Sequence, residues 1–154
     1  MAGHTPSVLV IGYGNPGRLD DGLGPALAGA LEAMALPGVT IEADYQLNVE
    51  HAALAAEHDV VVFADADVSC DPPFRFERIE PTVELSFSSH SLSPAAVLGT
   101  ARSLLRAGTL GYVLGIRGYA FNEFGECLSP EAVCNLAEAV EFLAKRVQAR
   151  DLAM

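Results

Sequence analysis

The sequence predicts an α/β fold: a three-layer sandwich in which a mainly parallel, twisted sheet of about five strands carries helices on both faces. Two short runs, residues 8–11 and 59–64, are apolar throughout apart from Asp59 and are typical of strands covered on both sides. Between and after these runs, apolar residues recur at helical spacing. The alternation continues along 154 residues without a repeat or a low-complexity linker. We therefore expect one domain spanning residues 1–154.

Cap and turn residues mark the elements of the first half of the chain. Apolar residues spaced from Leu23 to Met34 predict a first helix, which Pro37 and Gly38 end. Residues 39–43 follow as a second strand. Asn48 is a suitable N-cap for a short alanine-rich helix over residues 49–58. The buried strand 59–64 is expected to end in a turn over residues 65–67.

The second half is marked in the same way. After Pro72 and Pro73, the alternating residues 74–85 predict an edge strand or an extended excursion. A serine followed by proline begins a helix twice, at Ser93 and at Ser129, with a last buried strand over residues 109–116 between them. The apolar side of the closing helix is expected to consist of Val133, Leu136, Val140, Leu143 and Val147.

The charge of the chain excludes some partners. Nine basic and 20 acidic residues give a formal net charge of −11. Nucleic-acid binding needs clustered Lys and Arg, and the same negative charge disfavours anionic membranes, so we expect neither partner. The N-terminus lacks the basic and apolar segments of a signal peptide, and no apolar stretch is long enough to span a membrane. Three cysteines without a CxxC motif are typical of reduced thiols, and we expect a cytoplasmic monomer.

The loop after the first strand contains a glycine pattern. Gly12, Gly14 and Gly17 satisfy GxGxxG between a strand and a helix, which is the pattern of dinucleotide-binding folds. Against that function, Pro16 removes one backbone N–H from the turn, and the acidic pair 20–21 would repel a pyrophosphate. A Rossmann-like dinucleotide-binding module nevertheless stays open as an alternative.

Asp21, Asp65 and His90 form a candidate metal site. Each follows an expected strand or lies in the loop that follows it, and the ends of parallel strands meet at one edge of a sheet. Two carboxylates and an imidazole suit a divalent ion such as nickel, zinc or iron, with coordination positions left open. Singly, each residue has a simpler structural explanation: an aspartate capping a helix or a turn, or a histidine packed in the core. Spacing alone does not decide between them.

The chain resembles the hydrogenase maturation endopeptidases, which trim the C-terminal tail from the large subunit of nickel–iron hydrogenases. Three motifs carry the resemblance, in the expected order and strand context. They are a glycine–asparagine turn and acidic pair (residues 12–15 and 20–22), an aspartate after a buried strand (residues 61–66), and a histidine after small residues (88–90). Segments 44–50 and 88–94 look most like the branch serving soluble, NAD-reducing hydrogenases. Many members of the family carry glutamate at the position where this chain has Asp21.

The resemblance implies an aspartic-type endopeptidase that removes a C-terminal extension from a hydrogenase large-subunit precursor after nickel insertion. Asp21, Asp65 and His90 would then be both the catalytic and the metal-contacting residues, and nickel would come with the substrate. Because three protein ligands leave coordination positions open, only a nickel-loaded precursor would complete the site. The competing hypotheses are a dinucleotide-binding module and a metal chaperone, neither with hydrolytic activity.

Overall fold

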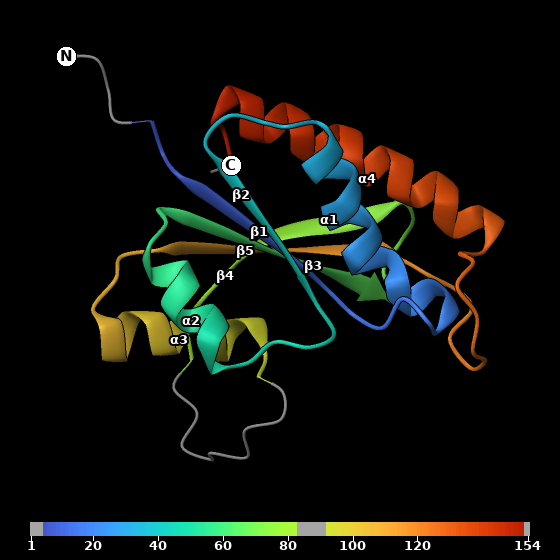
Figure 1. Cartoon of the computed structure of the whole chain (residues 1–154), viewed down its shortest axis with the longest axis horizontal. Helices are drawn as coiled ribbons and strands as arrows, with labels where there is room; N and C mark the ends of the chain where they lie inside the picture. The colour runs from blue at the N-terminus through green and yellow to red at the C-terminus, as the bar shows by residue number, and fades with distance from the viewer. Residues whose placement is uncertain (1–4, 83–91, 153–154) are drawn as a thin grey trace.

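The computed structural model describes residues 5–82 and 92–152. These residues form a five-stranded sheet of order β2-β1-β3-β5-β4, with helices above and below it in Figure 1. The strands are β1 (Val8–Tyr13), β2 (Val39–Asp44), β3 (Val60–Asp67), β4 (Phe74–Ile79) and β5 (Leu110–Arg117). The helices are the short 3-10 helix η1 (Leu19–Gly22) and the α-helices α1 (Leu23–Ala33), α2 (Val49–Ala56), α3 (Pro94–Leu105) and α4 (Pro130–Ala149).

The sheet has helices on both faces, so the predicted three-layer α/β architecture is confirmed. Strands β2, β1, β3 and β5 are parallel, and only β4 is antiparallel to its neighbour. Helices α1 and α4 cover one face, where Val10, Val62 and Leu143 are buried in one apolar core. Helices α2 and α3 cover the other face, where Ile11, Phe63 and Val97 are buried in a second core. Alternate residues of β1 and β3 thus point into different cores, as expected for strands buried on both sides.

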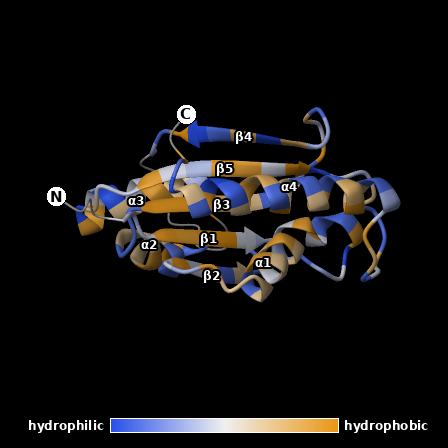
Figure 2. Ribbon diagram, turned by 90° about the horizontal axis from the view of Figure 1, so that it is seen from above, coloured by the Kyte–Doolittle hydropathy of each residue, from blue (hydrophilic) through white to orange (hydrophobic). Residues whose placement is uncertain are grey.

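The two margins of the sheet differ in composition. Figure 2 shows β4 at one margin and β2 at the other. The edge strand expected over residues 74–85 is confirmed as far as Ile79, as β4, and residues 83–85 lie outside the described residues. Strand β4 carries the charged residues Arg75, Glu77 and Arg78 along the margin. Charged residues on an edge strand discourage pairing with another chain. Strand β2 ends in three exposed residues and, among the described residues, has no strand beyond it.

Two expectations about individual elements are wrong. The turn expected at residues 65–67 is strand: β3 continues to Asp67, because residues 65–67 pair in register with Gly115, Ile116 and Arg117 of β5. Val133 does not belong to the buried side of α4 and is 50% exposed. The small side chain of Ala132 and the polar one of Asn135 are buried instead, since Asn135 donates a hydrogen bond to the Arg117 carbonyl.

No helix in the described residues is long and apolar enough to cross a membrane.

Candidate active site at the carboxyl edge of the sheet

Glycines bring η1 and the start of α1 into direct contact with the ends of β1 and β3. A Cβ added at Gly24 would clash with the carbonyl oxygens of Tyr13 and Ala64. Gly14 has a φ of +139°, a conformation that favours glycine, and a Cβ there would clash with the Asp21 carbonyl. The backbone of η1, which contains Asp20 and Asp21 and is called the acidic turn below, can therefore lie directly against the carboxyl ends of these strands. This is where open α/β sheets bind ligands.

The two adjacent acids of this turn have different roles. Asp20 is fully buried, and its carboxylate accepts hydrogen bonds from the backbone N–H groups of Tyr119, Ala120 and Ser129 and from the Ser129 hydroxyl, at 2.7–3.0 Å. Burial would raise the pKa of Asp20, but these hydrogen bonds outweigh it and lower the pKa. Asp20 therefore fixes the loop between β5 and α4 to the acidic turn, and all its bonding capacity is used within the protein.

Asp21 is only partly buried and accepts one bond, from the Asn15 N–H at 2.9 Å. It lies close enough to Asp65 for its negative charge to raise the pKa of Asp65. The structure thus brings these two of the three predicted site residues to one edge of the sheet. It also shows that Asp21 and Asp20 differ in burial and in hydrogen bonding, which the sequence of the acidic pair does not reveal.

Asp65 is a carboxyl group with a raised pKa. Burial raises its pKa to about 6, although a hydrogen bond from the Ala66 N–H opposes this, and the charge of Asp21 adds to the rise. Tyr13 lines the same cavity as Asp65, and its own pKa is raised, mainly by burial and also by the negative charge of Asp65. Tyr13 was not among the predicted site residues. The sequence could have indicated Tyr13 as a site residue by its position. Because side chains alternate along a strand, Tyr13 lies on the same face of β1 as Ile11, two residues before it.

Asp67 lies two residues beyond Asp65 on the same strand but is held differently. Burial would raise its pKa, yet the hydrogen bond from Arg75 (2.6 Å) and those from the Ser69 and Cys70 N–H groups lower it to about 2. Asp67 is thus an ionised partner of Arg75. Among the described residues, no ion pair holds Asp65 in its ionised form, and its pKa of about 6 lies nearer to neutral pH than that of Asp67.

A cavity of about 260 Å³ lies in front of Asp65. Tyr13, Asp65 and Asp67 line it from the strand ends, Arg75 from the neighbouring edge strand, and Ser93 from the N-terminus of α3. The cavity thus lies between the carboxyl edge of the sheet and the N-terminus of α3, and open α/β folds bind ligands at this edge.

His90, the third predicted site residue, lies outside the described residues. The described residues alone contain no group of three or more His, Cys, Asp or Glu side chains able to hold a metal ion. The carboxylates of Asp21 and Asp65 supply oxygen ligands suited to a divalent cation, and a further ligand would complete the chemistry expected for nickel. The three-residue site stays a prediction.

The turn that satisfies GxGxxG has no free amides for a pyrophosphate. The N–H groups of Gly14, Asn15 and Gly17 donate to the Asp44 carbonyl, the Asp21 carboxylate and the Asn15 side chain, respectively. Those of Arg18 and Leu19 donate to the carbonyls of residues 15 and 125, and Pro16 has none. A dinucleotide would have to displace this network, so the structure disfavours the Rossmann alternative.

Comparison with solved structures identifies the fold. HycI, a [NiFe] hydrogenase maturation protease from Thermococcus kodakarensis KOD1, is 22% identical over 96% of this chain and 95% of its own, with a TM-score of 0.71. The hydrogenase maturating endopeptidase HybD from E. coli is 24% identical over 93% of each chain, with a TM-score of 0.73. A hydrogenase 2 maturation peptidase from Thaumarchaeota archaeon SCGC_AB-539-E09 is 22% identical over 96% and 99%, with a TM-score of 0.69.

No protein-family model matches the chain, and no curated protein sequence matches it. The similarity therefore lies in the three-dimensional structure, along nearly the full length of the chain and of the proteins compared. The chain has the α/β fold of the hydrogenase maturation proteases.

Proposed function

We propose that this protein is an endopeptidase that removes the C-terminal extension of a nickel–iron hydrogenase large-subunit precursor after nickel insertion. The observation that carries the proposal is the pair Asp21 and Asp65, whose carboxylates lie near one another at the carboxyl edge of a fold shared with hydrogenase maturation proteases. A catalytic carboxylate must be free to contact the substrate. The carboxylates of Asp20 and Asp67 are instead held by hydrogen bonds and an ion pair within the protein.

In the proposed mechanism, Asp21, Asp65 and His90 contact nickel that the precursor carries, so nickel is part of the substrate. The support for His90 is its sequence position, three residues before Ser93, which lines the same cavity as Asp65. The bound ion would polarise the scissile carbonyl or activate a water molecule. One of the two carboxylates acts as general base on that water, which would make the enzyme aspartic in type.

Mass spectrometry of a nickel-loaded precursor, incubated with and without this protein, tests the proposal. We expect the precursor to become shorter only when it carries nickel. Asp65→Asn and His90→Ala should slow the shortening by about a hundredfold or more, the scale of losing an acid–base group. Asp151→Asn is the matched control, because Asp151 is exposed beyond the end of α4.

Three results would contradict the proposal. The first is shortening at the normal rate by the Asp65→Asn variant, with its thermal unfolding unchanged. The second is tight NAD binding by the wild-type protein combined with no cleavage of any nickel-loaded precursor, which would favour the dinucleotide-binding alternative. The third is nickel binding by the isolated protein without cleavage, which would favour the metal chaperone.

We further propose that the precursor belongs to a soluble, NAD-reducing hydrogenase and that the protein acts in the cytoplasm as a monomer. The support for the substrate is the sequence of segments 44–50 and 88–94, and the support for the cytoplasm is that the three cysteines are free thiols. Competition between precursors of a soluble NAD-reducing and a membrane-bound hydrogenase tests the substrate, with preferential cleavage of the first expected. Sedimentation velocity tests the monomer.

A further inference from the structure

We infer that the free margin of β2 is a strand-addition site for an extended segment of the protein substrate in which basic and apolar residues alternate. The inference rests on the proposed function for the identity of the substrate, but it concerns a surface separate from the three candidate catalytic residues. It assigns to β2 the recognition of the polypeptide that the carboxyl edge then cleaves.

The orientation of the β2 backbone follows from two hydrogen bonds. The carbonyls of Gly38 and Asp44 accept from the N–H groups of Val8 and Gly14 in and beside β1, at 3.3 and 3.0 Å. Successive residues of a strand direct their peptide groups to opposite sides. The even-numbered residues of β2 thus face β1, and the backbone groups of Val39, Ile41 and Ala43 face outward. Because β2 is the last strand of the described sheet, these groups can pair with an added strand (Figure 2).

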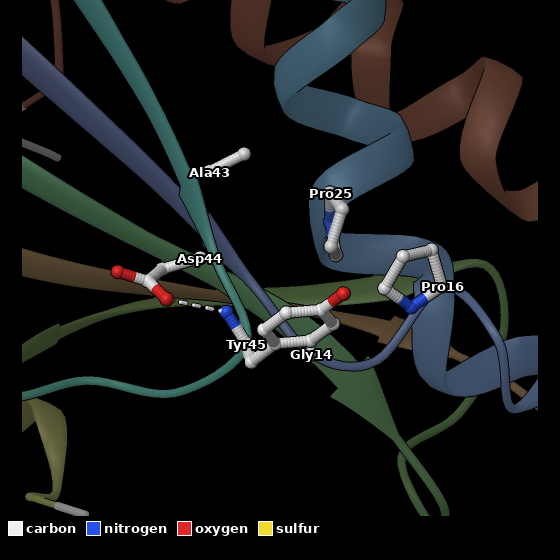
Figure 3. A pocket seen from close by; sticks show the side chains of 6 residues that line it. All are labelled: Gly14, Pro16, Pro25, Ala43, Asp44 and Tyr45. Carbon is white, nitrogen blue, oxygen red and sulfur yellow. Dashed lines mark hydrogen bonds between the residues drawn. The ribbon is translucent and has the colours of Figure 1, made fainter.

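Hollows flank this margin on the α1 side. A cavity of about 380 Å³ lies beside Val39 and Ile41 and is bounded by Leu31 and Leu36. A second, of about 220 Å³, lies at the end of β2 between Ala43, Tyr45, Pro25 and the Gly14–Pro16 turn. Figure 3 shows the Tyr45 ring turned toward the two prolines, whereas the Asp44 carboxylate points away from them. Apolar side chains of an added strand fit these hollows.

The α2 side of the same margin is acidic. A cavity of about 380 Å³ is lined by the acidic residues Glu42 and Asp44 from β2, Glu50 from α2 and Glu57, which follows the end of α2. The one basic group in its lining, His51, lies 3.6 Å from Asp44. Since side chains of a strand alternate between faces, a peptide beside β2 would direct every second residue into this acidic cavity. Charge complementarity therefore selects Lys or Arg at those positions.

The same charges oppose a second copy of this chain as the occupant. Pairing of two β2 margins would bring the acidic cavities of two molecules together, each molecule having a net charge of −11. The end of the margin also adjoins the site, because the cavity at Ala43 is bounded by Gly14, which contacts Asp21. A peptide seated along β2 is thus directed to the carboxyl edge.

The test measures binding of a fluorescein-labelled nine-residue peptide with alternating arginine and valine to the full chain. Ala43→Pro removes an outward-facing N–H without removing a bond to β1, so the fold is expected to persist. We expect this variant to weaken binding about tenfold, the scale of one or two lost hydrogen bonds. Glu42→Lys should weaken it similarly, whereas Glu138→Lys, the same charge change on an exposed position of α4, should not.

Peptides with alternate backbone nitrogens methylated provide the matched ligand control. Only one of the two alternate sets of amides can face β2, so one methylated peptide should lose binding while the other retains it. The identity of the methylated peptide that loses binding also shows whether the added strand is parallel or antiparallel to β2. If both methylated peptides bind like the parent, or if Ala43→Pro binds normally, the inference is wrong. It is also wrong if Ala43→Pro changes only the oligomeric state, because the margin then holds a second copy.

Failure of this inference and failure of the proposed function give different results. If the peptide binds as expected but no nickel-loaded precursor is shortened, the protease assignment fails and the strand-addition site remains. If Ala43→Pro and Glu42→Lys shorten the precursor at the wild-type rate, the protease assignment remains and β2 is not its recognition surface.

Discussion

At the scale of single residues, neighbouring acids with the same chemistry are divided between structural and potential catalytic roles. Asp20 is fully buried and accepts four hydrogen bonds that join the acidic turn to the loop before α4. Asp21 accepts one and remains partly exposed. Asp65 and Asp67 repeat this division on β3, where only Asp67 is paired with an arginine. The number of internal donors that reach each carboxylate decides its role.

This division predicts that one of two adjacent substitutions lowers stability and that the other abolishes cleavage. Asp20→Asn should lower the free energy of unfolding by about 3 kcal/mol, because it removes a buried charge from several N–H donors and introduces an amide N–H that opposes them. Asp21→Asn should change stability by less than about 1 kcal/mol, since it affects one hydrogen bond, but it should abolish precursor cleavage. Urea denaturation and the cleavage assay measure the two effects. Equal destabilisation by both substitutions would contradict the division.

The stabilisation due to Asp20 also depends on pH in a definite direction. Its pKa in the folded protein is lowered from the ordinary value of about 3.9, so the folded state favours the ionised form. The contribution is fully present above about pH 4 and is lost as the pH falls through the lowered pKa. The stability difference between the wild-type protein and Asp20→Asn should therefore shrink on acidification below pH 4, measured by urea denaturation at several pH values.

At the scale of the elements, α1 depends on direct backbone contact with the sheet. Gly24 lies against the carbonyls of Tyr13 and Ala64, whereas Gly29, five residues along the same helix, has no atom within 4 Å of an added Cβ. Gly24→Ala should therefore destabilise the protein by about 3 kcal/mol and displace Asp21, lowering cleavage. Gly29→Ala should stabilise it by about 0.5–1 kcal/mol, because alanine favours a helix interior. Thermal and urea unfolding of the pair check this prediction, and destabilisation by both would contradict it.

The end of helix α2 is fixed by a side chain from the segment that precedes β5. The buried Thr109 hydroxyl lies 3.0 and 2.9 Å from the carbonyl oxygens of Ala55 and His58, just before β5 begins. Thr109→Val keeps the shape but leaves these carbonyls without that donor, and should destabilise the protein by about 1–2 kcal/mol. Thr100→Val is the control, because its hydroxyl bonds only the Ala96 carbonyl within α3. Urea denaturation of both variants measures the difference.

At the scale of the whole molecule, charge is the property that bears on partner choice. A net charge of −11 and the acidic cavity beside β2 favour a basic polypeptide. Because salt screens charges over about 8–10 Å at physiological ionic strength, raising the salt concentration should slow association with the arginine–valine peptide, with dissociation affected less. Stopped-flow fluorescence at several salt concentrations measures both rates. A rate of association independent of salt would show that the acidic cavity does not attract the peptide.

The sequence by itself determined the elements and their layering. Buried runs, helical spacing and paired cap signals such as Ser93-Pro94 and Ser129-Pro130 are local, and the structure confirms the α/β sandwich that they predict. Element ends were predicted less well where non-local pairing extends a strand, as β5 does for β3 through Asp67. The nearness of Asp21 and Asp65 could be expected because parallel strands end at one edge.

Only the tertiary structure decided what each polar group at that edge is free to do. Asp20 and Asp21 are equivalent in sequence, and they differ because the loop before α4 returns about 100 residues later and supplies its donors to Asp20 alone. The role of Tyr13 and the outward backbone of β2 are also set by strand order, which no local pattern encodes. Local sequence specifies conformation through short-range sterics and burial, whereas hydrogen-bond partners and open margins depend on which distant segments meet.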